Sequence, residues 1–171
     1  SNPRAGGIIA MGIDENDAVI AVRLSDGHSE VFIGTREGMA IRFAETDVRS
    51  MGRTAYGVRG IQLREGDEVV TLEVVDPGGT LLTVTQKGYA KRTEIDEYRV
   101  QSRGGVGIKN LEVTDKNGLV VGIAQVHENE ELLVITQQGK ILRTPANEIR
   151  TVGRATQGVR VMDLGDDDSV V

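Results

Sequence analysis

Arginine and glycine recur together in this sequence, and the combination suits the binding of phosphate groups. An arginine side chain presents a fork of donors that can hold a phosphate through two hydrogen bonds. Glycine lets the backbone come close to a phosphate and expose its N–H groups. Three loops share this pairing, because a glycine follows Arg53, Arg103 and Arg154 by four residues in each case. These loops are therefore candidate phosphate sites.

The pairing belongs to a pattern that repeats three times with a period of about fifty residues. In each copy a glycine is followed four residues later by an arginine, and two more basic residues come eleven and seventeen residues after that arginine. The three equivalent sets are Arg42, Arg92 and Arg143, then Arg53, Arg103 and Arg154, then Arg59, Lys109 and Arg160. Agreement without gaps at these offsets indicates an internal repeat, and such periods are typical of solenoids and propellers.

We expect phosphate contacts from the nine residues of this register and from four more basic residues close to them. The four are Arg49, Lys91, Arg99 and Arg150. Arg23 and Lys116 lie outside the register, so we expect them to contribute little. A rigid duplex bent around such a repeated basic track would meet phosphates at regular intervals, with no base reading.

The distribution of charge supports a polyanionic partner, although the net charge is −6. Residues 36–64, 87–109 and 140–160 hold 17 of the 20 Lys and Arg, but only seven of the 26 Asp and Glu. A local basic surface attracts a polyanion within a Debye length of about 8–10 Å, whatever the net charge. The other interpretation is that strand ends and turns simply carry solvated charges.

Each copy is predicted to contain four short strands, because short β-branched or apolar runs alternate with turn residues. The first strands are expected at 19–22, 69–72 and 120–123, the second at 31–33, 81–84 and 132–135, the third at 39–43, 89–93 and 140–144, and the fourth at 58–63, 108–113 and 159–164. A Thr-x-x-Gly turn separates the second strand from the third, and its glycine can take a positive φ. One capped helical turn is expected near Pro145 and Glu148.

Four strands in about fifty residues predict one blade of an all-β, propeller-like disc. The fourth strand leads into the next copy, so neighbouring blades are expected to share or exchange strands. The chain is then a fragment of one domain, with repeats near 11–60, 61–110 and 111–161, while 1–10 and 162–171 belong to neighbouring blades. Aromatic residues make up only 3% of the sequence and there are 22 glycines, which predicts many turns and a core of Val, Ile and Leu.

Several other kinds of site are excluded by the sequence. The glycine-rich run 104–107 lacks the Gly-Lys-Ser/Thr of a phosphate-binding P-loop. His28 and His127 occupy different repeat positions, and the acidic run 166–168 lacks the alternation of a calcium loop. The absence of cysteine excludes disulfides and thiolate metal sites, and no apolar run is long enough to span a bilayer. We therefore expect no catalytic residue, metal or cofactor in this segment.

In these basic loops the chain resembles the C-terminal domain of the A subunit of DNA gyrase and, more broadly, its topoisomerase IV relative. The stretches that carry the resemblance are 1–4, 7–10, 40–43, 47–49, 51–60, 98–105 and 153–160. The resemblance implies a β-pinwheel of four-stranded blades whose basic perimeter wraps double-stranded DNA and supports negative supercoiling. It also implies a bacterial, cytoplasmic parent of composition A2B2 that associates with the nucleoid, and that uses ATP and Mg²⁺ in other domains.

One motif departs from the family. Residues 101–107 keep the frame of the gyrase-specific box, but Ser102 and Val106 replace two of its basic residues. We therefore expect the working box upstream of Ser1, which leaves gyrase and topoisomerase IV both open, while the regular repeats favour gyrase. A protein-binding propeller of the chromosome-condensation-regulator type also repeats near fifty residues. An enzyme built on a propeller would need a convergent polar centre, whereas the repeated polar positions here are predicted to be peripheral.

Overall fold

The computed structural model describes residues 6–171 and is built almost wholly from short β-strands, which confirms the all-β prediction. The matching stretch 1–4, and half of the piece assigned to a preceding blade, lie outside the described residues. The strands are β1 (Glu30–Thr35), β2 (Met39–Ala44), β3 (Val69–Val75), β4 (Thr80–Thr85), β5 (Tyr89–Glu94), β6 (Ile108–Lys109), β7 (Val120–Val126), β8 (Glu131–Ile135), β9 (Ile141–Pro145) and β10 (Val159–Arg160).

The predicted second and third strands of each copy form the antiparallel hairpins β1–β2, β4–β5 and β8–β9. Each hairpin turns at the expected glycine, and Gly38, Gly88 and Gly139 have φ of +82°, +77° and +83°. A side chain at Gly38 would also collide with the carbonyl oxygen of Leu111. All three turns therefore require glycine for backbone conformation, and Gly38 and Gly88 are required for space as well, since a side chain at Gly88 would collide with the Met162 carbonyl oxygen.

The outer strands of each sheet come from a different copy than predicted. One sheet has the order β3-β1-β2-β6 and the next β10-β5-β4-β7, so each joins a hairpin to the first and fourth strands of the following copy. The expected exchange of strands between neighbours is confirmed, but the assignment of all four strands to one copy is wrong. Segment 19–22 lies in no strand. β3 pairs with β1, which belongs to the hairpin that precedes it in the chain. The equivalent partner of segment 19–22 would be a hairpin before residue 19, and residues 6–18 form none.

The fourth strands are also shorter than predicted. Residues 58–63 form no strand, while β6 and β10 contain two residues each. A glycine with positive φ directly precedes each of these segments, as in Gly57 at +81° and Gly107 at +74°. This left-handed residue limits the ladder on one side, and β6 ends where the N–H groups of Asn110 and Leu111 both donate to the Gly38 carbonyl.

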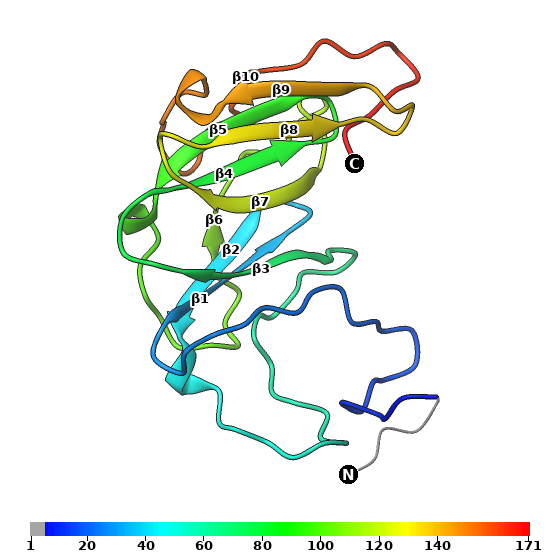
Figure 1. Cartoon of the computed structure of the whole chain (residues 1–171), viewed down its shortest axis with the longest axis vertical. Coiled ribbons are helices and arrows are strands. Elements are labelled where there is room, and N and C mark those ends of the chain that lie inside the picture. Colours follow the sequence, from blue (N-terminus) through cyan, green and yellow to red (C-terminus); the bar gives the residue numbers. More distant parts are fainter. Residues whose placement is uncertain (1–5) are drawn as a thin grey trace.

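A 3-10 turn follows the third strand in all three copies, although the sequence predicted only one. The turns are η1 (Glu45–Asp47), η2 (Ile95–Glu97) and η3 (Ala146–Glu148), and none has a side-chain cap hydrogen bond. Figure 1 shows the three turns along one edge of the molecule, in cyan, green and orange. Every copy thus sends its chain away from the sheet at the same edge.

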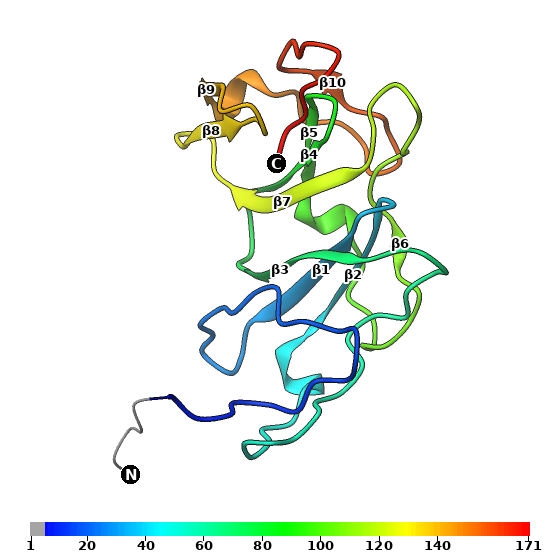
Figure 2. The same cartoon turned by 90° about the vertical axis from the view of Figure 1, so that its right-hand side faces the viewer.

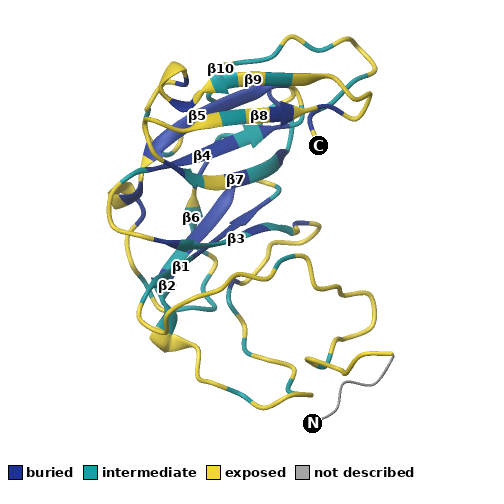
Figure 3. Ribbon diagram, viewed as in Figure 1, coloured by how far each residue is buried: buried dark blue, intermediate teal, exposed yellow. Residues whose placement is uncertain are grey.

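The sheets follow one another along the long axis (Figures 1 and 2). Apolar side chains of neighbouring sheets pack together between them. Phe32, Leu81 and Ile123 belong to the cluster that joins the first two sheets, and Leu82 and Ile149 to the cluster next to β8–β9. Burying one such side chain stabilises a fold by about 1.5–3 kcal/mol. Figure 3 shows this burial concentrated in the strands, whereas residues 7–28 are mostly exposed. Within residues 6–171 no helix has the length and hydropathy to span a membrane.

Candidate nucleic-acid interface

Three irregular segments carry most of the predicted contact residues. Residues 48–60, 98–110 and 149–161, which we call the outer segments, each follow a 3-10 turn. Together they contain nine basic residues and no acidic residue. The nine are Arg49, Arg53, Arg59, Arg99, Arg103, Lys109, Arg150, Arg154 and Arg160. All nine were predicted from the sequence, and the structure brings them together on equivalent segments.

Two of the outer segments run along the outer edges of the four-stranded sheets. Segment 98–110 runs alongside β2. The Gln101 N–H donates to the Arg42 carbonyl at 2.9 Å, and β6, which is part of the segment, pairs with the start of β2. Segment 149–161 runs alongside β5 in the same way. The Val152 N–H donates to the Arg92 carbonyl at 2.8 Å, and β10 pairs with the start of β5. Figure 2 shows β6 on the outer side of β2. Backbone pairing therefore fixes the path of both segments.

Successive outer segments also contact one another. The Gly104 N–H donates to the Gly60 carbonyl at 2.6 Å, and the Gln62 N–H donates to the Gly105 carbonyl at 2.8 Å. One copy further on, the Arg154 guanidinium donates to the Lys109 carbonyl, and the N–H of Glu112, two residues beyond segment 98–110, donates to the Thr156 carbonyl at 3.0 Å. Hydrogen bonds thus connect the basic segments from copy to copy.

Arg49, Arg99 and Arg150 are the most accessible equivalent set. Each lies two residues beyond a 3-10 turn, is exposed, and forms no side-chain hydrogen bond or ion pair with any part of the chain that the structure describes. The backbone next to Arg99 and Arg150 is nevertheless anchored, because Val100 and Thr151 bridge to β2 and β5. A fixed backbone with a free guanidinium can bind a phosphate without breaking an internal contact.

The third set of the register is exposed as well, with weak surface partners. Lys109 pairs with Glu112, and Arg160 pairs with Asp163 at 2.9 Å. Arg160 also lies over the Tyr89 ring, 5.7 Å from its centroid. Exposed ion pairs contribute only about 0–1 kcal/mol, so these cations can exchange their partners for a phosphate. Arg59 and Arg53 are exposed and lack a side-chain partner among residues 6–171.

Arg103 and Arg154 have a partly structural role. The Arg103 guanidinium donates from Nε to the Asp47 carbonyl at 2.8 Å and from Nη1 to the Arg59 carbonyl at 3.1 Å. Arg154 likewise donates from Nη1 to the Lys109 carbonyl. Each of these arginines holds the outer segment of the preceding copy while its remaining N–H groups stay available. The register therefore combines binding with positioning.

Three of the predicted contact residues, two from the register and one close to it, lie inside the molecule and leave our contact set. Arg42 pairs with Glu30 and donates to the carbonyls of Ile95 and Tyr98 at 2.9 and 3.0 Å, with 10% of its side chain exposed. Arg92 is 5% exposed and donates from Nε to the Ile149 carbonyl at 2.8 Å.

Both arginines thus join a strand to the 3-10 turn of the next copy. The third residue, Lys91, is 0% exposed. A buried cation with internal partners cannot reach a phosphate. Arg143, the third equivalent of Arg42, is 71% exposed at its side chain, pairs only with Glu131, and stays in the set.

Sequence periodicity missed one nearby cation. Lys116 lies over the same aromatic ring as Arg160, with its Nζ 5.6 Å from the Tyr89 centroid. Lys116 lies outside the register, because its equivalents in the other copies are Gly66 and Asp167. The expectation that Lys116 contributes little to phosphate binding stays a prediction, although no repeat-based signal could have placed this lysine beside Arg160. Lys116 is therefore unsuitable as a distant control.

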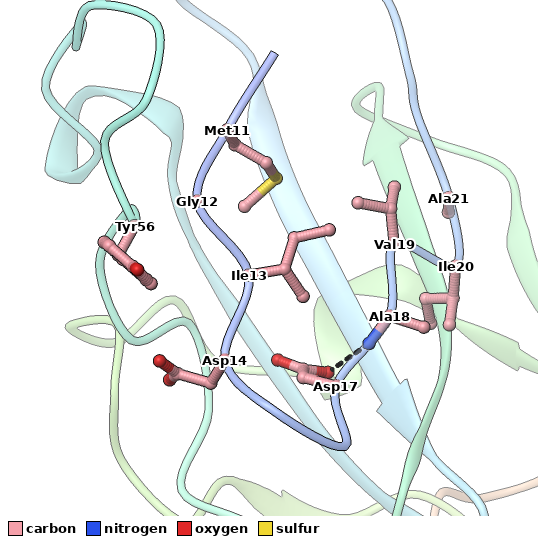
Figure 4. Close-up of a pocket in the computed structure, with 10 residues that line it drawn as sticks. All are labelled: Met11, Gly12, Ile13, Asp14, Asp17, Ala18, Val19, Ile20, Ala21 and Tyr56. Atoms are coloured by element: carbon pink, nitrogen blue, oxygen red, sulfur yellow. Dashed lines mark hydrogen bonds between the residues drawn. The ribbon is translucent and has the colours of Figure 1, made fainter. Parts of the chain in front are cut away.

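A separate pocket of about 240 Å³ lies between the N-terminal segment and Tyr56 (Figure 4). Its only charged lining residues are Asp14 and Asp17, and Asp17 accepts a hydrogen bond from the Ala18 N–H at 2.8 Å. Two carboxylates would repel a phosphate, and the remaining lining is largely apolar. This pocket does not extend the basic surface. Residues 6–171 also contain no group of three His, Asp or Glu placed to hold a metal ion.

Comparison with known proteins identifies relatives over the whole chain. The family model described as DNA gyrase C-terminal domain, beta-propeller, matches residues 1–26, 29–76, 79–127 and 130–171. The DNA gyrase A subunit of Haloquadratum walsbyi is 48% identical over 171 residues, which are 99% of this chain and 20% of that protein. The Escherichia coli protein of the same name is 44% identical over 168 residues, or 98% and 19%. The chain thus spans about one fifth of these relatives.

Two solved structures share the fold. A DNA gyrase A C-terminal domain superposes with a TM-score of 0.91 at 31% identity, covering 97% of this chain and 57% of that one. The C-terminal domain of a DNA topoisomerase IV gives a TM-score of 0.90 at 26% identity, covering 96% and 51%. The propeller-like architecture expected from the repeats is therefore confirmed.

Proposed function

The chain belongs to the DNA gyrase C-terminal domain family, and from this premise we propose that it binds double-stranded DNA along its outer segments without reading sequence. The observation that carries the proposal is the set of three outer segments, which hold nine basic residues and no acidic residue and are hydrogen-bonded from copy to copy. Double-stranded DNA carries one negative charge per about 1.7 Å of axis, so such a surface gains affinity by releasing counterions. No α-helix is present among the described residues to enter a groove, which favours backbone contacts over base reading.

The contacts divide into three groups in this proposal. Arg49, Arg99 and Arg150 provide one free guanidinium for each copy. Flanking contacts come from Arg53, Arg59, Lys109, Arg143 and Arg160. Arg103 and Arg154 hold neighbouring outer segments and offer their remaining N–H groups. Because the free guanidinium set recurs once per copy, a duplex that follows the outer edge must curve with it, and we propose that the chain wraps DNA.

We further propose that this segment acts within a DNA gyrase and supports negative supercoiling by it, while strand cleavage and ATP hydrolysis take place in other domains. Its partners would then be the remaining domains of the A subunit, together with the B subunit, in an A2B2 assembly within the compartment that holds the chromosome. ATP and Mg²⁺ would be bound elsewhere. The polar groups found here serve the fold or the outer surface, and we assign none of them a catalytic role.

The binding proposal is tested by titrating labelled linear duplexes of unrelated sequence at two or more salt concentrations. Fluorescence anisotropy should show equal affinity for the sequences and a steep loss of affinity with salt, about 0.9 log units per log unit of salt for each phosphate neutralised. Affinity that does not change with salt would refute an electrostatic interface. Binding of a protein ligand with no DNA binding would favour the protein-binding propeller.

Wrapping needs its own measurement. Relaxed circular DNA is bound by the chain, treated with a nicking-closing topoisomerase and deproteinised. A curved path around the outer segments should leave a change in linking number that grows with the amount of protein. An unchanged linking number at saturating protein would restrict the function to binding.

A further inference from the structure

The middle copy contains a buried polar cluster that its neighbours lack. Its four side chains are between 0% and 1% exposed and are Thr83, Lys91, Tyr98 and Asn110. At the equivalent positions the first copy has Ile33, Ile41, Val48 and Gly60, and the third copy has Val134, Leu142, Ile149 and Val161. Packing of this fold therefore does not require polar residues at these positions, because two copies fill them with apolar residues or glycine.

The ammonium of Lys91 has three acceptors, all of them backbone carbonyls. It donates to Asn110 at 2.5 Å, to Gly153 at 3.1 Å, and to Arg154. Asn110 is the last residue of one outer segment, while Gly153 and Arg154 belong to the next. One buried cation therefore connects two outer segments that come from different copies.

The rest of the cluster fixes the acceptors. The Tyr98 hydroxyl donates to Asn110 Oδ1 at 2.5 Å, and Asn110 Nδ2 donates to Thr83 Oγ1 at 3.1 Å. Asn110 is thus held from both sides, and Tyr98 is itself packed edge-on against Phe32 with the ring centroids 5.1 Å apart. A buried polar group must be satisfied, so these bonds restrain the backbone at both ends of segment 98–110.

The restrained backbone carries exposed cations. Tyr98 precedes Arg99, Asn110 follows Lys109, and Arg154 is itself an acceptor of Lys91. The Arg154 backbone N–H donates to Glu97 at 2.8 Å, and its guanidinium donates to the Lys109 carbonyl. Every strong contact of this junction therefore positions a residue of the proposed DNA surface.

We infer that Lys91 is a positioning residue for DNA binding, which sets Lys109 and Arg154 at the junction of the second and third copies so that both meet the same duplex. This inference rests on the proposed function. A buried lysine is costly to desolvate, and the apolar residues of the other copies avoid that cost. In return, its three donors fix two segments relative to each other, which an isoleucine or leucine cannot do.

The test compares Lys91→Met with Ile41→Met. The first removes the ammonium but keeps an unbranched stem, and the second places the same side chain at the equivalent buried position of the first copy. We expect Lys91→Met to fold and to lose about 3- to 10-fold in affinity for a linear duplex at 0.1 M salt, with a salt slope lower by about one to two phosphates. Ile41→Met should keep the slope of the parent.

Hydrogen exchange of the free protein supplies a readout that does not depend on DNA. Amides at 110–112 and 153–156 should exchange faster in Lys91→Met, while amides at 42–49 should not. Uniform acceleration over the whole chain would indicate a merely structural role and would overturn the inference. Unchanged exchange at the junction would overturn it equally.

Restoration of the charge completes the test. The sequence contains no cysteine, so Lys91→Cys introduces a single thiol that can be aminoethylated in the unfolded chain before refolding. The product carries an ammonium at the length of lysine and should recover the parental slope. If the parent binds DNA but Lys91→Met retains its slope, the role of Lys91 is wrong and the proposed function stands. If the parent shows no salt-dependent binding, the proposed function itself fails.

Discussion

The outer segments and the turns that follow them carry opposite charge, although they are consecutive in the sequence. The outer segments hold nine basic residues and no acidic one, whereas residues 62–68, 112–119 and 163–169 hold nine acidic residues and two basic ones. We call the second group the acidic turns. The alternation occurs in every copy, so the folded chain separates charge by region and not by copy.

The two regions use their charges differently. In the acidic turns, Asp67 Oδ1 accepts hydrogen bonds from the N–H groups of Glu37 at 3.0 Å and Glu68 at 2.8 Å. Asp168 repeats this with Gln138 and Ser169 at 3.1 and 2.9 Å. These carboxylates connect a turn to a neighbouring hairpin by hydrogen bonds. The most exposed arginines of the outer segments form no side-chain hydrogen bond with the described residues. Under the proposed function, the acidic turns maintain the fold and repel a duplex, while the outer segments attract it.

The largest expected effect comes from removing the free guanidinium set. Arg49→Ala, Arg99→Ala and Arg150→Ala together should lower duplex affinity by about 10²- to 10³-fold at 0.1 M salt and reduce the salt slope by up to about three phosphates' worth. The thermal midpoint should stay close to that of the parent, because exposed substitutions change stability by less than about 0.5 kcal/mol each. Anisotropy titrations across a salt series measure the slope directly. A parental slope in the triple variant would mean that the outer segments are not the contact surface.

A second prediction concerns how stability depends on pH through Lys91, the buried lysine that connects two outer segments. Burial lowers the pKa of Lys91 from 10.5 to about 8, with Glu97 raising it and Arg154 lowering it to smaller extents. Between those values the unfolded chain binds a proton that the folded chain does not, so the free energy of unfolding should rise with pH. The rise over pH 8 to 10 should amount to about 2 kcal/mol.

Above pH 10 the trend should reverse. Burial raises the pKa of Tyr98, so the folded chain keeps a phenolic proton that the unfolded chain loses, and stability falls as the pH increases. Urea unfolding at a series of pH values measures both limbs. The Lys91→Met variant should lose the rise between pH 8 and 10. A parent with flat stability over that interval would contradict the assignment.

Removal of a carboxylate from an acidic turn should have the opposite signature, with stability lowered and DNA binding kept. Asp67→Ala leaves two partly buried N–H groups without their charged acceptor, and we expect a loss of about 1–3 kcal/mol in unfolding free energy. Asp67→Asn should cost less, since Asn117 occupies the equivalent position and its Oδ1 accepts from the Thr114 N–H. Denaturant midpoints and the salt slope, measured on the same variants, separate the two regions. A changed salt slope in Asp67→Ala would contradict the separation of roles between acidic turns and outer segments.

Local features of the fold were predictable from the sequence, and distant pairings were not. The hairpins follow from apolar runs on either side of Thr-x-x-Gly, because a turn is decided within a few residues. The partner of β3 was assigned incorrectly, since the sequence pattern is the same whether that strand begins one blade or completes the preceding one. The strand at 89–94 has a polar sequence, yet five of its six residues are buried, because the neighbouring copy covers it.

The candidate site divides in a similar way. Repetition identified the nine outer cations, because a surface built from equivalent segments repeats its charges. It also selected Arg42 and Arg92, since an arginine that joins successive copies is repeated for structural reasons and has the same signature. Lys116 was placed outside the register because its position has no basic equivalent, although it lies over the same aromatic ring as Arg160. Periodicity therefore shows which residues occupy equivalent positions in the three copies. Burial and hydrogen-bond partners are needed to distinguish a residue that can bind DNA from one that stabilises the fold.

The smallest expected effect provides the sharpest test of the two-region comparison. Arg36, Arg64 and Lys140 are half-exposed or exposed cations at hairpin or acidic turns, at the opposite ends of the strands from the 3-10 turns. Replacing all three by alanine removes as much charge as the Arg49, Arg99 and Arg150 triple. At 0.1 M salt the Debye length is about 10 Å, so distant charges should be screened, and we expect affinity to change by less than about threefold.

The salt slope should stay within about one phosphate of the parent in this variant. Arg36 pairs with Glu68 at 2.9 Å, and this surface pair contributes about 0–1 kcal/mol, so the variant should also remain folded. If both triple variants lose affinity and slope equally, net charge alone governs binding, and the separation of outer segments from acidic turns has no functional meaning. A large loss confined to the outer-segment triple would establish that position decides which cations bind.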